Sequence, residues 1–178
     1  MIFRCTRLEG ARLIEPEFHR DTRGFFSRTW CREEFFAEGL DTEIAQESLS
    51  YNGKRGTVRG LHFQRSPHQE TKIVRCIRGA IWDVILDLRQ SSPTYLQWQG
   101  FELTAENFRA LYIPKGFAHG FQTRCDDSLV SYQISTPYAP HAAGGCRYDD
   151  PLFAIEWPDQ ATEISARDLE WPDFISGC

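Results

Sequence analysis

The sequence lacks three features that would assign it to large classes of protein. Its six cysteines contain no Cys-x-x-Cys pair, which argues against a zinc site and favours reduced thiols over disulfides. No stretch approaches the roughly 18 apolar residues of a membrane span, and the first residues lack the apolar core of a signal peptide. We therefore expect a cytoplasmic protein that does not enter a membrane. The cysteines are Cys5, Cys31, Cys76, Cys125, Cys146 and Cys178.

A basic surface is also missing. The formal net charge is −5 and no run of Lys and Arg occurs, whereas a protein that neutralises nucleic-acid phosphates needs such a surface. The sequence therefore predicts that nucleic acid is not a partner. Scattered arginines still permit binding of a small phosphate-bearing ligand.

The composition that remains is that of a globular protein, with 41% hydrophobic and 25% charged residues in a chain of 178. A chain of this size buries roughly two-thirds of its unfolded surface, so it needs no disulfides to form a core. We predict one domain over residues 1–178. β-rich runs separated by turn clusters dominate after residue 40, which favours an all-β sandwich or barrel. One short peripheral helix is predicted at residues 31–40, with Thr29 as its cap and Gly39 near its end.

Two predicted strands carry polar side chains at alternating positions. In residues 81–88 the alternation places Asp83 opposite Val84, and in residues 129–136 it places Tyr132 beside Val130 on one face. Both side chains are candidates for the interior of a barrel. The equally weighted alternative is that Asp83 lies on a solvated face and Tyr132 is an ordinary core residue.

A histidine in a strand-like segment is the first candidate for chemistry. Arg59 and His62 are three residues apart, so a regular strand points them to opposite faces, and they share a face only if the glycine between them bends the chain. His62 lies between two apolar residues, and a lone histidine in that setting is more often a hydrogen-bonded core residue. A functional role for His62 depends on what surrounds it.

Residues 114–120 (PKGFAHG) have the P-x-G-x-x-H pattern of a cupin motif, in which a tight turn delivers a histidine, here His119, into a small β-barrel. Metal-binding cupins begin their site with H-x-H, whereas this sequence has His62-Phe63-Gln64, and Glu70 is imperfectly spaced. Stable first-row metal sites use three or four such ligands. We predict an all-β cupin barrel with a few short peripheral helices and with neither a metal nor another cofactor.

Several separate motifs resemble those of the dTDP-4-dehydrorhamnose 3,5-epimerase family, which are cupin-fold enzymes of deoxysugar nucleotide synthesis. Their order and spacing agree from residue 21 to residue 168. The motifs are residues 21–26 (DTRGFF), 59–64 (RGLHFQ), 72–75 (KIVR), 83–84 (DV), 92–94 (SPT), 113–121 (IPKGFAHGF), 149–151 (DDP) and 165–168 (SARD).

The resemblance implies a catalytic set and a substrate-binding set. It assigns His62 as the base, Asp168 as its dyad partner, Tyr132 as the acid on the opposite face of the sugar, and Lys72 as a neighbour of the C4 oxygen. A ketone at C4 acidifies the hydrogens on C3 and C5, and an enolate can be reprotonated from the other face. The substrate-binding positions are Arg23, Arg28, Gln46, Ser48, Arg59, Asp83, His119 and Tyr138.

The resemblance therefore predicts epimerisation of dTDP-4-dehydro-6-deoxy-D-glucose at C3 and C5. Arg28 and Ala143 stand where the family has Glu, and Ser48 where it has Asn, which leaves open a CDP-linked or other nucleotide sugar. Epimerisation at one carbon also stays open. Alternatives from other classes are a metal-dependent cupin oxygenase or isomerase and an inactive sugar-binding cupin. The family further implies a homodimer in which Arg23 and Arg28 reach the partner's nucleotide.

Overall fold

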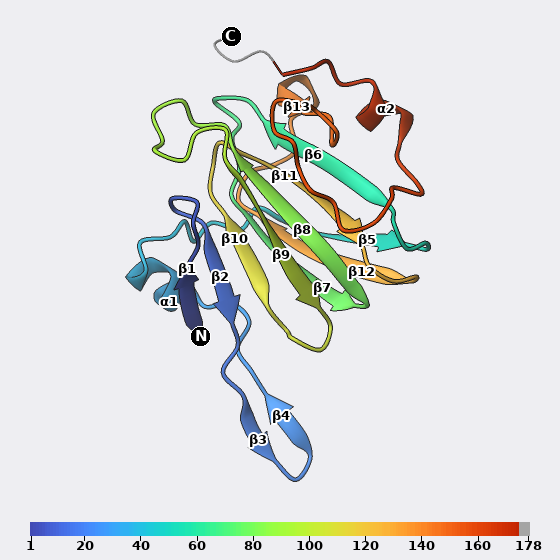
Figure 1. Ribbon diagram of the computed structural model, residues 1–178. Helices are drawn as coiled ribbons and strands as arrows, with labels where there is room; N and C mark the ends of the chain where they lie inside the picture. The colour runs from blue at the N-terminus through green and yellow to red at the C-terminus, as the bar shows by residue number, and fades with distance from the viewer. Residues whose placement is uncertain (175–178) are drawn as a thin grey trace.

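The computed structural model describes residues 1–174, which fold into two facing β-sheets and a separate hairpin (Figure 1). The first sheet has the order β1-β2-β10-β7-β12-β5 and the second the order β13-β6-β11-β8-β9. Every pairing between these strands is antiparallel, which suits sheets that bury one face against each other. The predicted all-β architecture is confirmed.

The strands of the first sheet are β1 (Ile2–Cys5), β2 (Arg12–Glu15), β10 (Ala110–Ile113), β7 (Lys72–Arg78), β12 (Ser128–Ile134) and β5 (Gln46–Asn52). Those of the second are β13 (Ala143–Gly145), β6 (Val58–Gln64), β11 (Phe117–Thr123), β8 (Ala80–Asp87) and β9 (Trp98–Thr104). The hairpin consists of β3 (His19–Asp21) and β4 (Gly24–Phe26). The helical segments are α1 (Arg32–Ala37), the 3-10 turn η1 (Pro140–Ala142) and α2 (Ala166–Leu169).

The main core lies between the two sheets. Val74 and Val130 of the first sheet belong to the same buried cluster as Ile85, Leu103 and Phe121 of the second. Burying each side chain of this size contributes roughly 1.5–3 kcal/mol, which makes this layer the main source of stability. The cluster extends to Tyr132, which is only partly buried, so the core merges with a more open end of the barrel.

Both faces of β8 are buried, which settles the alternative left open for Asp83. Val84 and Leu86 pack outward against a second cluster that includes Phe153 of the C-terminal segment, while Ile85 packs inward. Asp83 is fully buried on the inward face, so the alternative of a solvated position is wrong. The C-terminal segment covers the sheet face that a two-layer barrel would otherwise leave open.

Asp87 has a structural role at the end of the same strand. Its carboxylate pairs with Arg89 at 2.7 Å and accepts hydrogen bonds from Ser92 at 2.6 Å and Thr94 at 2.7 Å. Burial opposes ionisation of Asp87, but these bonds outweigh it and lower the pKa of its carboxyl below the ordinary value. The loop that follows β8 is thereby tied to the strand.

The helix α1 is shorter than predicted and its cap differs. The predicted Thr29 cap is wrong, because Cys31 occupies the N-cap and makes no side-chain capping hydrogen bond. Phe35 is the buried helix residue, packed edge-on against Phe3. Gly39 ends the helix as predicted: it has a φ of 70°, and the next amide returns to the carbonyl of Phe35 at 3.0 Å.

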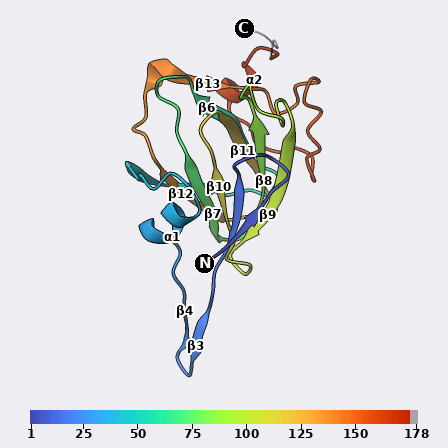
Figure 2. The same cartoon turned by 90° about the vertical axis from the view of Figure 1, so that its left-hand side faces the viewer.

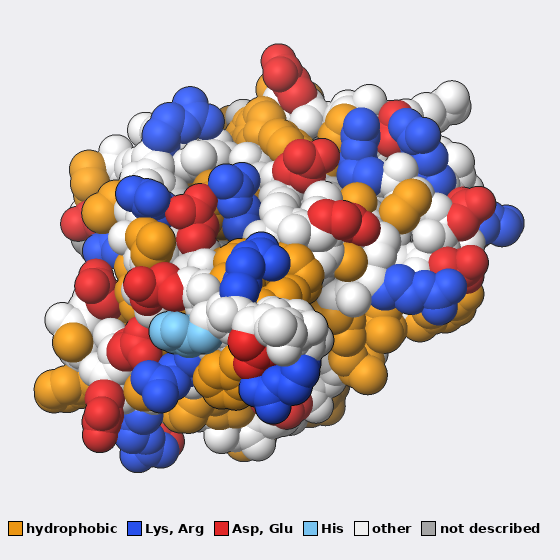
Figure 3. Space-filling view, turned by 90° about the horizontal axis from the view of Figure 1, so that it is seen from below, with side chains coloured by type: hydrophobic (Ala, Val, Ile, Leu, Met, Phe, Trp, Pro, Cys, Tyr) orange, Lys and Arg blue, Asp and Glu red, His pale blue; other side chains and the backbone are white. Residues whose placement is uncertain are grey.

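The β3–β4 hairpin projects from the barrel in both ribbon views (Figures 1 and 2). Phe25 and Phe26 on it are 43% and 70% exposed. From this end of the molecule, acidic and basic side chains are interspersed over the visible surface (Figure 3). Within residues 1–174, no helix has the length and apolar character to cross a bilayer.

The thiols provide a test of the packing. The described cysteines are all free, with Cys5 exposed and Cys76 and Cys146 buried, whereas Cys178 lies outside the described residues. Burial raises the pKa of the Cys76 and Cys146 thiols to about 12. We expect Ellman's reagent at about pH 8 to modify Cys5 rapidly and these two only on unfolding, with the sites identified by peptide mass spectrometry. Rapid modification of Cys76 or Cys146 in the folded protein would contradict this packing.

Candidate active site

A pocket of about 290 Å³ opens between the two sheets. β6 and β11 of the second sheet contribute His62 and His119, and β7 and β12 of the first contribute Lys72 and Tyr132. The structure thus brings together eight residues predicted from the sequence. They are Gln46, Ser48, Arg59, His62, Lys72, His119, Tyr132 and Tyr138. The lining also includes Leu49, Ser50, Glu70, Phe121 and Ile134, which the sequence reasoning did not assign to the site.

An irregular strand explains why Arg59 and His62 share this pocket. His119 pairs with His62 but Phe121 pairs with Arg59, so β6 has one residue more than β11 across this stretch. Gly60 has a φ of 118°, and a Cβ atom at this position would lie 2.5 Å from the Cα of Gly120. Only glycine fits this approach, and the resulting bend turns Arg59 to the same side as His62.

Asp168 holds the His62 ring from behind. Its Oδ1 lies 2.6 Å from His62 Nε2, and its Oδ2 accepts a hydrogen bond from the amide of Gly60 at 3.3 Å. Ser165 caps α2 by accepting from the Asp168 amide at 3.1 Å, which fixes the position of the carboxylate. Because a carboxylate only accepts, Nε2 carries the hydrogen of the neutral ring and Nδ1 keeps the lone pair. The His62 side chain is 44% exposed, so the alternative of a core histidine is wrong.

The charge of Asp168 is stabilised despite its burial. Desolvation opposes ionisation, but the hydrogen bond and the attraction to His62, together with the bonds from Gly60 and Ser165, lower the pKa of Asp168 below the ordinary value. The carboxylate therefore stays ionised well below neutral pH and keeps the imidazole in one tautomer.

A second histidine–carboxylate pair adjoins the same pocket, which only its histidine lines. His119 Nε2 is 2.7 Å from Asp83 Oδ1, and both side chains are buried. Asp83 Oδ2 has no hydrogen-bond partner among the described residues. Asp83 thus contacts His119 and does not itself line the pocket.

Tyr132 faces the pocket from the opposite sheet. Its ring lies edge-on to that of His119, with the centroids 5.9 Å apart. Desolvation, followed by the nearby charge of Asp83, raises the pKa of the Tyr132 phenol despite the opposing effect of Arg59. The hydroxyl therefore stays protonated across the physiological range and is available as a donor.

Lys72 is paired with a residue that the sequence reasoning did not place in the site. Its Nζ lies 3.0 Å from Glu70 Oε1 and donates to the carbonyl of His62 at 3.3 Å. Gln64 donates to the other oxygen of Glu70 at 2.6 Å. Glu70 and Lys72 are two residues apart, and residues at that spacing point to the same side of an extended chain. This spacing is the sequence signal that could have placed Glu70 in the site.

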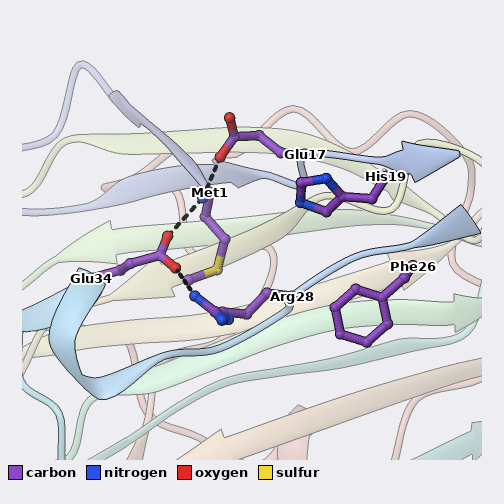
Figure 4. A pocket seen from close by; sticks show the side chains of 6 residues that line it. All are labelled: Met1, Glu17, His19, Phe26, Arg28 and Glu34. Carbon is purple, nitrogen blue, oxygen red and sulfur yellow. Dashed lines mark hydrogen bonds and ion pairs between the residues drawn. The ribbon is translucent and has the colours of Figure 1, made fainter.

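Two predicted binding residues lie elsewhere in the chain. Arg23 is exposed at the hairpin turn and pairs with Asp21 at 2.5 Å. Arg28 lines a separate pocket, where it pairs with Glu34 at 2.8 Å (Figure 4). The same carboxylate of Glu34 also holds the N-terminal amine of Met1, which Glu17 contacts from the other side. Within this chain the structure does not bring Arg23 or Arg28 to the His62 pocket.

A further cavity of about 420 Å³ adjoins the first on the other side of His62. Arg59 and His62 line both cavities, and Arg167 lines only the second. Arg167 directly precedes Asp168 in the SARD motif, and that adjacency is the signal that sequence reasoning did not use. Two guanidinium groups thus border the space beside the His62–Asp168 pair.

The described residues contain no group of three or more His, Cys, Asp and Glu side chains placed to hold one metal ion. The Nε2 atoms of His62 and His119 instead face the carboxylates of Asp168 and Asp83.

Comparison with known proteins places this arrangement in a family. The sequence model described as dTDP-4-dehydrorhamnose 3,5-epimerase matches residues 5–176. The chain belongs to this family. The dTDP-4-dehydrorhamnose 3,5-epimerase of Sinorhizobium fredii is 41% identical over 176 residues, which cover 98% of this chain and 90% of that protein. A dTDP-4-dehydrorhamnose 3-epimerase of Streptomyces niveus is 40% identical over 172 residues, covering 96% and 82%.

Solved structures of family members share the fold. The crystal structure of the Bacillus anthracis dTDP-4-dehydrorhamnose 3,5-epimerase, with TDP and PPi bound, matches with a TM-score of 0.93 at 38% identity, covering 97% of this chain and 99% of that one. The predicted cupin-type fold and the resemblance stated from motifs are thereby confirmed. The protein is an isomerase-class member of a sugar-nucleotide epimerase family.

The depressed pKa of Asp168 gives a testable pH dependence. A carboxyl whose folded-state pKa is lowered contributes stability above its unfolded pKa of about 4, and that contribution is lost as the pH falls through the folded-state value. We expect the unfolding free energy of the wild type relative to Asp168→Asn to rise between about pH 2 and pH 5. Urea unfolding at several pH values measures the difference. A difference that is constant over this range would contradict the ionised pair.

Proposed function

We propose that this protein converts dTDP-4-dehydro-6-deoxy-D-glucose to dTDP-4-dehydro-L-rhamnose by epimerisation at C3 and C5. The observation that carries the proposal is the placement of His62, with Asp168 behind it, and Tyr132 on opposite sheets around one pocket. Inversion by proton transfer needs a base on one face of the sugar and an acid on the other. Most curated relatives among those compared carry the 3,5-epimerase name, which supports the double reaction.

The first step in this proposal is removal of a proton from carbon. His62 Nδ1 takes the proton from C3 or C5, and the electron pair of the C–H bond moves toward the C4 carbonyl to form an enolate. Asp168 stabilises the imidazolium that results and keeps the ring oriented. A well-placed base of this kind contributes roughly 10²- to 10⁴-fold to the rate.

The second step is reprotonation from the opposite face. The Lys72 ammonium, held by Glu70, offers positive charge to the enolate oxygen on C4. The Tyr132 phenol then gives its proton to the carbon, which leaves a phenolate and the His62 imidazolium. Solvent accepts the proton of the imidazolium and reprotonates the phenolate. Burial favours this return, because it raises the pKa of the Tyr132 phenol.

Binding of the nucleotide is assigned to the outer part of the pocket. Arg59, whose Nε donates to Asn52 at 2.7 Å, is our candidate for the pyrophosphate, and Tyr138 for stacking on the base. Gln46 and Ser48 on β5 provide further polar contacts. His119 and, through it, Asp83 complete the proposed binding set.

A second candidate function follows from a specific relative. The Streptomyces niveus protein is named a 3-epimerase and is as similar as several 3,5-epimerases, so a single inversion is compatible with the same catalytic set. The departures from the family at Arg28, Ser48 and Ala143 also keep a CDP-linked sugar as an alternative substrate. The isotope experiment below separates these possibilities.

We also propose a homodimer in which Arg23 and Arg28 act in the partner's pocket. The projecting hairpin with exposed Phe25 and Phe26 supports it, since apolar side chains on a projecting element are typical of an interface. The cytoplasmic location stays a prediction from the sequence.

The decisive experiment is incubation with dTDP-4-keto-6-deoxyglucose in heavy water. We expect solvent deuterium at both C3 and C5, because each inverted carbon receives its new hydrogen from a solvent-exchanged group. Mass spectrometry counts the deuterons and NMR locates them. Deuterium at one carbon would support the 3-epimerase alternative. If the folded protein gave no uptake with the dTDP-linked sugar but did with the CDP-linked sugar, the substrate would be the CDP-linked one.

His62→Ala is the matched test of the base. Exchange at both carbons should fall at least about 10²-fold while circular dichroism shows that the fold is retained. His141→Ala removes another histidine near the pocket that does not line it and should retain exchange. Undiminished exchange in a folded His62→Ala protein would reject the proposed mechanism.

Tyr132→Phe separates proton removal from proton return. The variant keeps the ring and its packing but loses the phenol. Deuterium should still enter the substrate with retained configuration, because His62 can return a solvent-derived proton to the same face. Formation of the inverted product should fall at least about 10²-fold, measured by NMR of the sugar. Equal loss of exchange and inversion would show that Tyr132 is also needed for deprotonation.

A further inference from the structure

We propose that His68 and His141 form a binding site for a divalent transition-metal ion, apart from the catalytic pocket. The two Nε2 atoms lie 3.2 Å apart, although the residues are 73 positions apart in the sequence. His68 is half-buried and His141 exposed, so solvent ions reach the pair. Neither residue lines the pocket around His62.

The geometry fits one ion between the two rings. Two Zn–N bonds of about 2.1 Å that span 3.2 Å meet at an angle of about 100°, between octahedral and tetrahedral values. Rings aimed at such an ion would have centroids about 5 Å apart, whereas collinear rings in a straight hydrogen bond would have them about 5.5 Å apart. The observed separation is 4.8 Å with the rings perpendicular. The rings are therefore not collinear, and their separation matches that of two rings sharing one ion more closely than that of a straight hydrogen bond.

The backbone on both sides of the pair is fixed, so the ligands need little rearrangement to bind. The His68 amide closes a turn onto the carbonyl of Arg65 at 2.9 Å. The amide of Arg65 in turn donates to the carbonyl of Ala142, and its guanidinium to that of Ala143, both at 2.8 Å. The turn that carries His68 and η1, which carries His141, are thus linked without the histidines. Such preorganisation reduces the entropy lost on binding.

The donor atoms select the class of ion. Two imidazole nitrogens favour Zn²⁺, Ni²⁺ or Cu²⁺ over Mg²⁺ and Ca²⁺, which prefer oxygen ligands. One ring must move its hydrogen from Nε2 to Nδ1 so that both Nε2 lone pairs face the ion, and two neutral rings lose no net proton. Because the described residues supply no third His, Cys, Asp or Glu, water completes the coordination and the ion remains exchangeable.

The site joins two turns that border the catalytic pocket. Glu70 follows His68 by two residues and Tyr138 precedes His141 by three, and both line that pocket. A bound ion would cross-link these turns only in the folded state, so it should raise the thermal unfolding temperature.

The test uses the full chain without an affinity tag, stripped with EDTA and titrated with NiCl₂ by calorimetry. We expect one Ni²⁺ per chain and a rise in Tm. His68→Gln and His141→Gln should each weaken binding at least about tenfold and abolish the rise in Tm, and the double variant should be no worse than either single one. His19→Gln removes an exposed histidine elsewhere and should bind as the wild type does.

Several results would overturn the site. One is the absence of both heat and a Tm change with the wild type, which would leave the pair as a hydrogen bond only. Another is full binding by either single variant. Co²⁺ spectra provide an independent check: a thiolate-to-cobalt charge-transfer band would place the ion on a cysteine. Metal-free Tm values of the variants show whether each is folded.

Discussion

The close approach of β6 and β11 at Gly60 and Gly120 is the constraint on which the site depends. A side chain at either glycine would meet backbone of the other strand, so the two strands could not keep their pairing. The approach inserts one residue into β6 and thereby turns Arg59 and His62 to the same side. The same pairing places His119 directly beside His62. Without this local irregularity, a regular sheet would divide these side chains between the interior and the outer face.

Buried carboxylates then give the two histidines different surroundings. Asp168 holds a ring that is partly open to the cavity, whereas Asp83 holds one that is almost fully buried. A carboxylate behind an imidazole fixes both its tautomer and its orientation, which is how a protein aims one nitrogen at a substrate. Tyr132 comes from the other sheet, and desolvation of its phenol keeps it protonated. In the proposed reaction, one sheet therefore supplies the base and the other supplies the acid.

The sequence predicted the features that depend on local pattern. Alternation in residues 81–88 put Asp83 on the face opposite Val84 but left open whether that face was buried or solvated, because β8 is covered on both faces. Gly39 marked the end of α1, but the cap was misplaced, since propensity alone does not show where the chain turns. The sequence could not show whether Arg59 and His62 share a face. That depends on the register shift between β6 and β11, which arises only when the two strands pair. Glu70 and Arg167 were missed although each lies within two residues of a predicted site residue, because such spacing alone does not show that both side chains reach one cavity. The grouping of Asp168 with His62 came only from family resemblance.

The bond between His62 and Asp168 joins residues 106 positions apart, and the carboxylate lies on the segment that covers the outside of the second sheet. The strands β5, β6, β7, β11 and β12 line the pocket and all come before this segment in the chain. A change that displaces the segment would therefore leave the pocket-lining strands untouched and still deprive the imidazole of the carboxylate that orients it. The shape of the cavity and the aim of the nitrogen inside it are encoded in different parts of the chain.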